Sequence, residues 1–108
     1  MALAFNISGI AVSGSNVEVV SRLFQGLERA RLYLANTGDA ALTAAKVQLG
    51  PTEEDLYDYD TDTFKTLAAG AMLGLQITGP ISALKVLATC EAGTTLRAWL
   101  DTEVGSAA

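Results

Sequence analysis

Three aspartates at alternate positions are the residues of this sequence whose spacing could do chemistry. Asp58, Asp60 and Asp62 could turn their carboxylates toward one point in a loop, and such oxygens are the ligands that calcium takes in proteins. An EF-hand loop that began at Asp58 would need glycine at its sixth position and glutamate at its twelfth, but Thr63 and Ala69 stand there. The pattern therefore favours a solvated acidic loop or edge strand, and a calcium site there stays open as the alternative.

Catalytic residue types are scarce in the rest of the chain. The sequence contains no histidine, which removes the commonest general base and the commonest transition-metal ligand. Its serines therefore have no histidine partner, and none of them lies in a Gly-x-Ser-x-Gly turn. Phosphate-binding and dinucleotide-binding fingerprints are also absent from the sequence. We therefore predict no catalytic site, no metal site and no cofactor, and a protein that is not an enzyme.

The charge of the chain is acidic and concentrated in one segment. The net charge is −5, and six of the 12 acidic residues lie within residues 53–62. Basic residues form no cluster of the kind that binds nucleic acid. No apolar run approaches the ~18 residues that a membrane helix needs, and the first residues do not resemble a signal peptide. The sequence therefore predicts neither a nucleic acid nor a membrane as its partner.

Alternating apolar and polar residues predict short strands separated by turns rich in glycine, proline and asparagine. The expected strands cover residues 3–12, with a bulge at Gly9, and 17–23, 29–34, 40–49, 73–77, 84–90 and 94–100. A short helix capped by Asp39 is the alternative for residues 40–49. We predict an all-β fold, a two-sheet antiparallel β-sandwich of immunoglobulin-like or jelly-roll type. It should form one domain over residues 1–103, with a flexible tail at 104–108.

The clearest pairing signal is a hairpin near the end of the chain. Residues 84–90 and 94–100 both alternate, and Gly93 supplies the positive φ that a three-residue loop needs. With Cys90 opposite Thr94, the predicted inward pairs are Ala88 with Leu96, Val86 with Ala98 and Leu84 with Leu100. Cys90, the only cysteine of the sequence, is then expected to be a small buried hydrophobe.

The outer face of this predicted hairpin is not plainly polar. In the same register Trp99 lies opposite Lys85, and Leu87 lies opposite Arg97. Either the basic side chains pack over the indole at the surface, or the face is an interface, where tryptophan, tyrosine and arginine are enriched. Tyr33 could extend this surface on another strand. The interface candidates are Trp99, Leu87, Lys85, Arg97 and Tyr33.

The order of strands and turns resembles a known class of protein. The segments that carry the resemblance are Leu34-Ala-Asn-Thr-Gly-Asp-Ala-Ala-Leu42, Leu67-Ala-Ala-Gly70 with Leu75 and Ile77, Leu84-Lys-Val-Leu-Ala, and Gly93-Thr-Thr. Over residues 30–102 the chain resembles small β-sandwich virion proteins of tailed bacteriophages: head decoration or cement proteins and related immunoglobulin-like modules.

The resemblance implies a structural protein of the virion, made in the host cytoplasm. Such a protein binds and stabilises the capsid, as a dimer or trimer, and its partners are the major capsid protein or other virion proteins. The alternative function is a carbohydrate-binding or receptor-binding module of a phage fibre or adhesin. Exposed aromatic residues with carboxylates would form its patch, namely Tyr57, Tyr59, Asp58 and Asp60.

Overall fold

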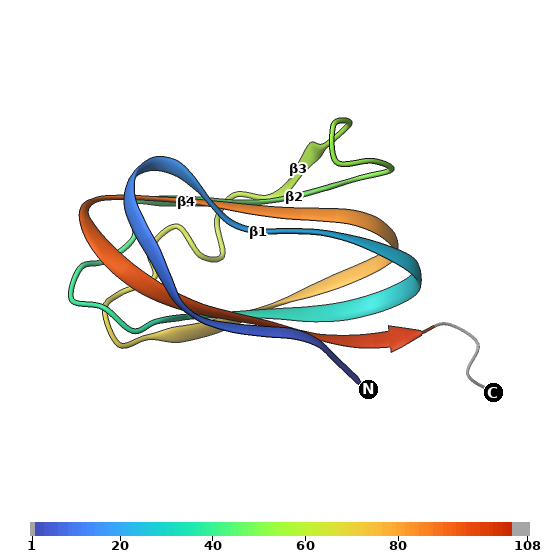
Figure 1. The fold of residues 1–108 in the computed structure, drawn as a ribbon, viewed down its shortest axis with the longest axis horizontal. Helices are drawn as coiled ribbons and strands as arrows, with labels where there is room; N and C mark the ends of the chain where they lie inside the picture. Colours follow the sequence, from blue (N-terminus) through green and yellow to red (C-terminus); the bar gives the residue numbers. More distant parts are fainter. Residues whose placement is uncertain (1, 105–108) are drawn as a thin grey trace.

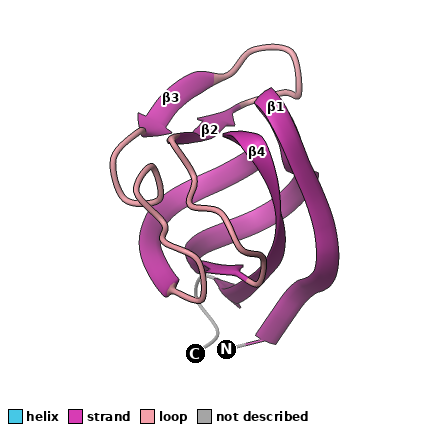
Figure 2. Cartoon of the chain, turned by 90° about the vertical axis from the view of Figure 1, so that its left-hand side faces the viewer, coloured by secondary structure: helices cyan, strands magenta, loops and turns pink. Residues whose placement is uncertain are grey.

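The computed structural model describes residues 2–104, with side chains described at 5–24, 28–78 and 81–102, and shows one curled antiparallel sheet (Figures 1 and 2). Its strands are β1 (Ala2–Asn36), β2 (Ala44–Gly50), β3 (Tyr57–Asp60) and β4 (Met72–Val104), in the order β1-β4-β2-β3. The prediction of an all-β antiparallel fold is confirmed, and the sheet forms a half-barrel. No helix, and so none that could cross a membrane, occurs in this part of the chain.

β1 and β4 are so long that each contributes to both halves of the curled sheet. The first half-sheet contains, side by side, residues 72–78, 29–36, 94–103 and 2–12. The second half-sheet contains residues 57–60, 44–50, 83–90 and 14–23. The paired chains pass from one half-sheet to the other at a corner where Gly14, Asn16 and Gly93 have positive φ values of 107°, 49° and 87°. Only glycine and asparagine adopt such values at little cost, so these residues allow the corner.

The predicted hairpin of residues 84–90 with 94–100 is wrong. Residues 83–90 pair with 14–23 on one side and with 44–50 on the other, so neither edge is free for 94–100. Residues 94–100 are likewise held between two segments of β1. The chain at Gly93 turns a corner together with its β1 partner, which places the two segments in different half-sheets. Alternation is the same in both arrangements, because either one buries every second residue.

The inward face predicted from alternation is confirmed. Every second residue from Leu84 to Cys90 and from Thr94 to Leu100 is buried, and Cys90 is 1% exposed. Gly9 has a φ of 69° at a register shift in β1, which confirms the predicted bulge. Segments outside the strands complete the core, and Figure 2 shows loops beside the curled sheet. Their buried apolar residues belong to the same core cluster as the strands: Leu42, Phe64 and Leu67.

Asn36, the last residue of β1 and 1% exposed, ties these segments to the sheet. Its Nδ2 donates to the carbonyls of Ala40 (2.8 Å) and Leu67 (3.1 Å). Its Oδ1 accepts from the Gly38 N–H (3.1 Å) and from Thr94 Oγ1 (2.7 Å). The amide thus uses both donors and both lone pairs of its oxygen, which allows a polar group to be buried at low cost.

Single side-chain contacts link the outer edges of the curled sheet. Tyr59 Oη on β3 donates to the carbonyl of Gln76 on β4 at 3.4 Å, and the Arg22 guanidinium lies 5.6 Å from the Phe5 ring centroid within β1. The start of β1 and the end of β4 run side by side (Figure 1), and Ala2 pairs with Thr102. β4 continues to Val104, the first residue of the predicted tail, and residues 105–108 lie outside the described part.

Candidate functional site

Trp99 lies on the outer side of the first half-sheet. Its neighbours Ala98 and Leu100 are fully buried, so the alternation of β4 turns Trp99 away from the core. The register places Asn6 beside it on one flank and Tyr33 on the other, with Gly74 beyond Tyr33. One row across the half-sheet therefore brings together residues that are far apart in the sequence.

The rings of Tyr33 and Trp99 are stacked. Their centroids are 5.2 Å apart and their planes differ by 17°. Gly74 stands on the far side of Tyr33, where an added Cβ would lie 3.0 Å from Tyr33 Cε1. A larger residue at position 74 would therefore force the tyrosine ring to move.

Arg97 covers the indole from its other flank. The guanidinium carbon lies 4.6 Å from the Trp99 ring centroid, and Arg97 Nε donates to Asn6 Oδ1 at 3.0 Å. Since the strands of Asn6 and Tyr33 flank β4 on opposite sides, Trp99 lies between the tyrosine ring and the guanidinium. The Nη atoms of Arg97 have no hydrogen-bond partner among the described side chains, and they are free to meet a carboxylate.

Two further side chains extend this surface over the edge segment of β4. Arg31 Nη2 donates to Gln76 Oε1 at 2.9 Å. Met72 is 57% exposed and pairs with Ala35, which in turn pairs with Arg97. We call this surface the Trp99 face; its residues are Asn6, Arg31, Tyr33, Met72, Gln76, Arg97 and Trp99.

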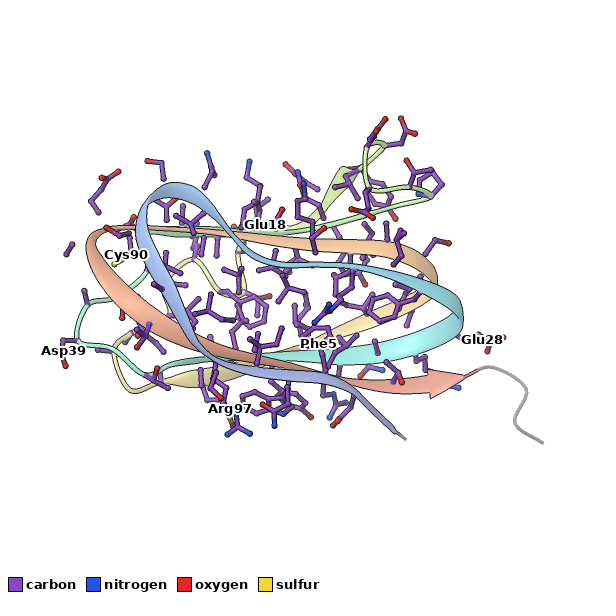
Figure 3. The ribbon with its side chains drawn as sticks, in the orientation of Figure 1. Phe5, Glu18, Glu28, Asp39, Cys90 and Arg97 are labelled. Carbon is purple, nitrogen blue, oxygen red and sulfur yellow. The ribbon has the colours of Figure 1, made fainter. Side chains whose placement is uncertain are left out.

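Lys85 and Leu87 do not belong to the Trp99 face. Both lie on the second half-sheet, where Lys85 pairs with Ser21 and Leu87 pairs with Glu18. Lys85 Nζ lies 3.8 Å from Glu18 Oε1. Figure 3 shows Arg97 and Glu18 on opposite sides of the molecule. The predicted surface that joined Trp99 to Lys85 and Leu87 is therefore wrong, because it depended on the hairpin register.

The three alternate aspartates point to different partners. Asp58 Oδ1 accepts from Gln48 Nε2 at 2.8 Å, and Asp62 Oδ1 lies 3.4 Å from Lys65 Nζ. Asp60 accepts three hydrogen bonds from its own turn: its Oδ1 from the N–H groups of residues 62 and 63, and its Oδ2 from the Thr63 hydroxyl. Within residues 2–104, no group of three or more acidic or sulfur ligands is placed to hold a metal ion.

The tyrosines of the acidic segment also diverge. Tyr57 is 59% exposed, whereas Tyr59 packs against the core and its hydroxyl is held by the Gln76 carbonyl. With Asp60 held within its own turn, the residues left for a carbohydrate patch are Tyr57 and Asp58.

A second surface feature was missed by the sequence reasoning. An open depression of about 770 Å³ is lined by Leu23 and by residues 51–55. Two further depressions adjoin it: both share Pro51 with the first, and both are lined by Ser82. Tyr57 lines one of these. We call this feature the Pro51 groove; its residues are Leu23, Pro51, Thr52, Glu53, Glu54, Asp55, Tyr57 and Ser82. Leu23 ends an alternating strand but is 59% exposed, and the alternation of the strand does not predict this exposure.

Comparison with known proteins identifies a shared fold. No protein-family description and no curated protein matches this sequence. Among solved structures, the chain is similar to the crystal structure of PirA, with a TM-score of 0.59 and 11% identity, over 92% of this chain and 94% of that chain. At this identity the likeness concerns the fold alone.

Structures of infectious bursal disease virus also resemble the chain. The Gx strain matches with a TM-score of 0.45 and the Gt strain with 0.42, each at 14% identity and over 95% of this chain. The chain spans 30% of the length of those chains. At these TM-scores the likeness carries no argument about function.

Proposed function

We propose that this chain is a structural protein that binds other proteins through the Trp99 face. The observation that carries the proposal is the stack of Tyr33, Trp99 and Arg97, with Arg97 held by Asn6. Tryptophan, tyrosine and arginine are the residues that most often dominate the energy of protein interfaces. Side chains that are already ordered lose little conformational entropy on binding, which favours affinity.

We further propose that the curled sheet is a jelly roll, a finer form of the all-β fold. The two half-sheets have four segments each, and the paired chains of β1 and β4 wind over both. Jelly rolls occur in viral capsid domains and in lectin domains. The fold is thus compatible with both functions expected from the sequence, so the residues of the binding surfaces must be used to distinguish the two functions.

The role that we propose is decoration or cementing of a virus particle, with the major capsid protein or another virion protein as partner. The resemblance of residues 30–102 to phage decoration proteins supports this role, and so does a binding surface on a sheet rather than on a loop, since sheets hold side chains more rigidly. Electron microscopy of particles from the source of this chain, labelled with an antibody against it, tests the role. We expect label at fixed lattice positions, and intact particles without label would refute the proposal.

The alternative, a carbohydrate-binding or receptor-binding module, has less support from the site. Tyr57 and Asp58 are the members of its predicted patch that stay available. On the Trp99 face, Tyr33 and Arg97 already occupy the flanks of the indole where a sugar ring would stack. A glycan array probed at high protein concentration tests the alternative. Specific binding that Tyr57→Ala abolishes and Trp99→Ala preserves would favour it over the decoration role.

A further inference from the structure

We propose that the Trp99 face of one copy of this chain binds the Pro51 groove of a second copy, in a head-to-tail contact that repeats from copy to copy. The proposal rests on the proposed function, because it assigns a partner to the same face. Its evidence is the complementary charge and the exposed apolar side chains of these two surfaces.

The Trp99 face is cationic, and its best-placed charge is unused. Arg97 is fixed through its Nε, and its Nη groups have no partner among the described side chains; in the adjacent row Arg31 lies beside Asp101, so Arg97 carries the uncompensated charge of this surface. An arginine held in this way recognises a carboxylate through two parallel hydrogen bonds.

The Pro51 groove is acidic, and its carboxylates are also unused. Glu53 and Glu54 are exposed, and neither carboxylate has a hydrogen-bond or ion-pair partner within the described residues. Asp55 is held by the Thr52 hydroxyl at 2.8 Å, and the Thr52 oxygen accepts from the N–H groups of Glu54 and Asp55. This turn therefore presents the two glutamates on an ordered backbone.

Exposed apolar side chains gather at the same two surfaces. Leu23 and Tyr57, each 59% exposed, line the Pro51 groove. Met72, 57% exposed, lies on the Trp99 face, whereas Leu73, 40% exposed at the edge of the sheet, pairs with the buried Leu34 and faces the other side of the sheet. These are the large hydrophobic residues that the described chain leaves most exposed, and burial of such side chains drives association.

The two surfaces lie at different places on the molecule. The turn of residues 51–55 projects beyond β2 and β3 at the upper right of Figure 1, whereas Arg97 lies below the lower ribbon in Figure 3. A twofold contact of the Trp99 face with itself would bring together two surfaces of the same net positive charge, which disfavours such a contact. A contact between different surfaces closes as a reciprocal pair or a ring, or it continues as an open filament.

Sedimentation velocity with two complementary variants tests the proposal. In Arg97→Ala/Trp99→Ala the face is removed and the groove is kept; in Glu53→Ala/Glu54→Ala the groove loses its charge and the face is kept. We expect wild-type protein at roughly 1 mM to form dimers or larger species, which dissociate as salt rises from about 0.05 to about 0.5 M. Each variant alone should be monomeric. An equimolar mixture should form a one-to-one dimer and nothing larger, because the intact Trp99 face of the groove variant binds the intact Pro51 groove of the face variant.

Other results would overturn the proposal. A wild-type chain that stays monomeric at this concentration excludes the contact, and a variant that assembles like the wild type excludes its surface. Dimers of the groove variant alone would instead show a twofold contact of the Trp99 face. Circular dichroism shows whether each variant is folded, and Lys85→Ala on the second half-sheet is the surface control that should assemble normally. Particle labelling is read separately, so a monomeric chain that decorates particles refutes this inference and leaves the proposed function intact.

Discussion

Tyr33 and Trp99 lie side by side on neighbouring strands, with ring centroids 5.2 Å apart and planes 17° apart. Stacked aromatic pairs contribute about 0.5–1.5 kcal/mol beyond the area that they bury. Here both rings are half-buried on the outer side of the sheet, and the Arg97 guanidinium lies 4.6 Å from the Trp99 ring centroid. A surface this ordered is prepared for a partner, and we expect it to account for most of the binding energy of the chain.

Asn36 is predicted to be the polar residue on which stability depends most. Asn36→Leu removes four hydrogen bonds and leaves the carbonyls of Ala40 and Leu67 and the N–H of Gly38 without their side-chain partner. We expect a loss of about 3 kcal/mol or more in the free energy of unfolding, since each buried unpaired group costs ~1–3 kcal/mol. Urea denaturation measures it. Thr37→Ala, which removes an exposed hydroxyl bonded to Thr95, is the control and should change stability by less than ~1 kcal/mol.

Gly38 is predicted to tolerate no side chain. An added Cβ would overlap Thr94 Oγ1 and lie 2.7 Å from the backbone nitrogen of Thr95, which is fixed in the sheet. Gly38→Ala should therefore lower the free energy of unfolding by about 2 kcal/mol, in the range of overpacked sites. Gly9→Asn is the matched control: no atom lies within 4 Å of its Cβ position, and asparagine accepts the φ of 69°. Equal denaturation midpoints for the two variants would contradict the packing at Gly38.

The sequence alone predicted which residues face the core and failed on which strands are neighbours. Alternation in residues 84–100 requires every second side chain to be buried, and this is what the structure shows. The neighbours of those strands depend on the corner at Gly14 and Asn16, some 75 residues earlier in the chain by the pairing of Gly14 with Cys90. No local pattern at Gly93 separates a hairpin from such a corner, because both need a positive φ there.

The residues of the Trp99 face were likewise predictable where their position depends on alternation and not where it depends on strand pairing. Arg97 is two residues from Trp99 on one strand, so its place beside the indole was predictable from the alternation of β4. Asn6 was not, since its position follows from a pairing between the first and last segments of the chain. Lys85 was misplaced for the same reason. A surface composed of several strands is predictable only when the register of all of them is known.

The acidic segment is predicted not to bind calcium. Its carboxylates are directed to Gln48, to Lys65 and to the turn that follows Asp60, and their convergence on one ion would break these contacts. We expect millimolar calcium to leave the melting temperature of the wild type unchanged. The triple variant Asp58→Asn/Asp60→Asn/Asp62→Asn should stay folded and respond to calcium in the same way. A marked calcium-dependent rise in the wild type that the triple variant lacks would restore the calcium site.

The central claim is that the Trp99 face is the surface by which this chain binds protein, and the affinity of Trp99→Ala for particles stripped of the chain tests it most directly. We expect the variant to bind more weakly than wild type by about 2 kcal/mol or more, roughly thirtyfold in dissociation constant, with its fold retained. Leu87→Ala, on the outer side of the second half-sheet, is the matched control and should bind within a factor of about two of wild type. Wild-type affinity in Trp99→Ala, with lost affinity in Leu87→Ala, would contradict the account and place the interface on the opposite side of the molecule.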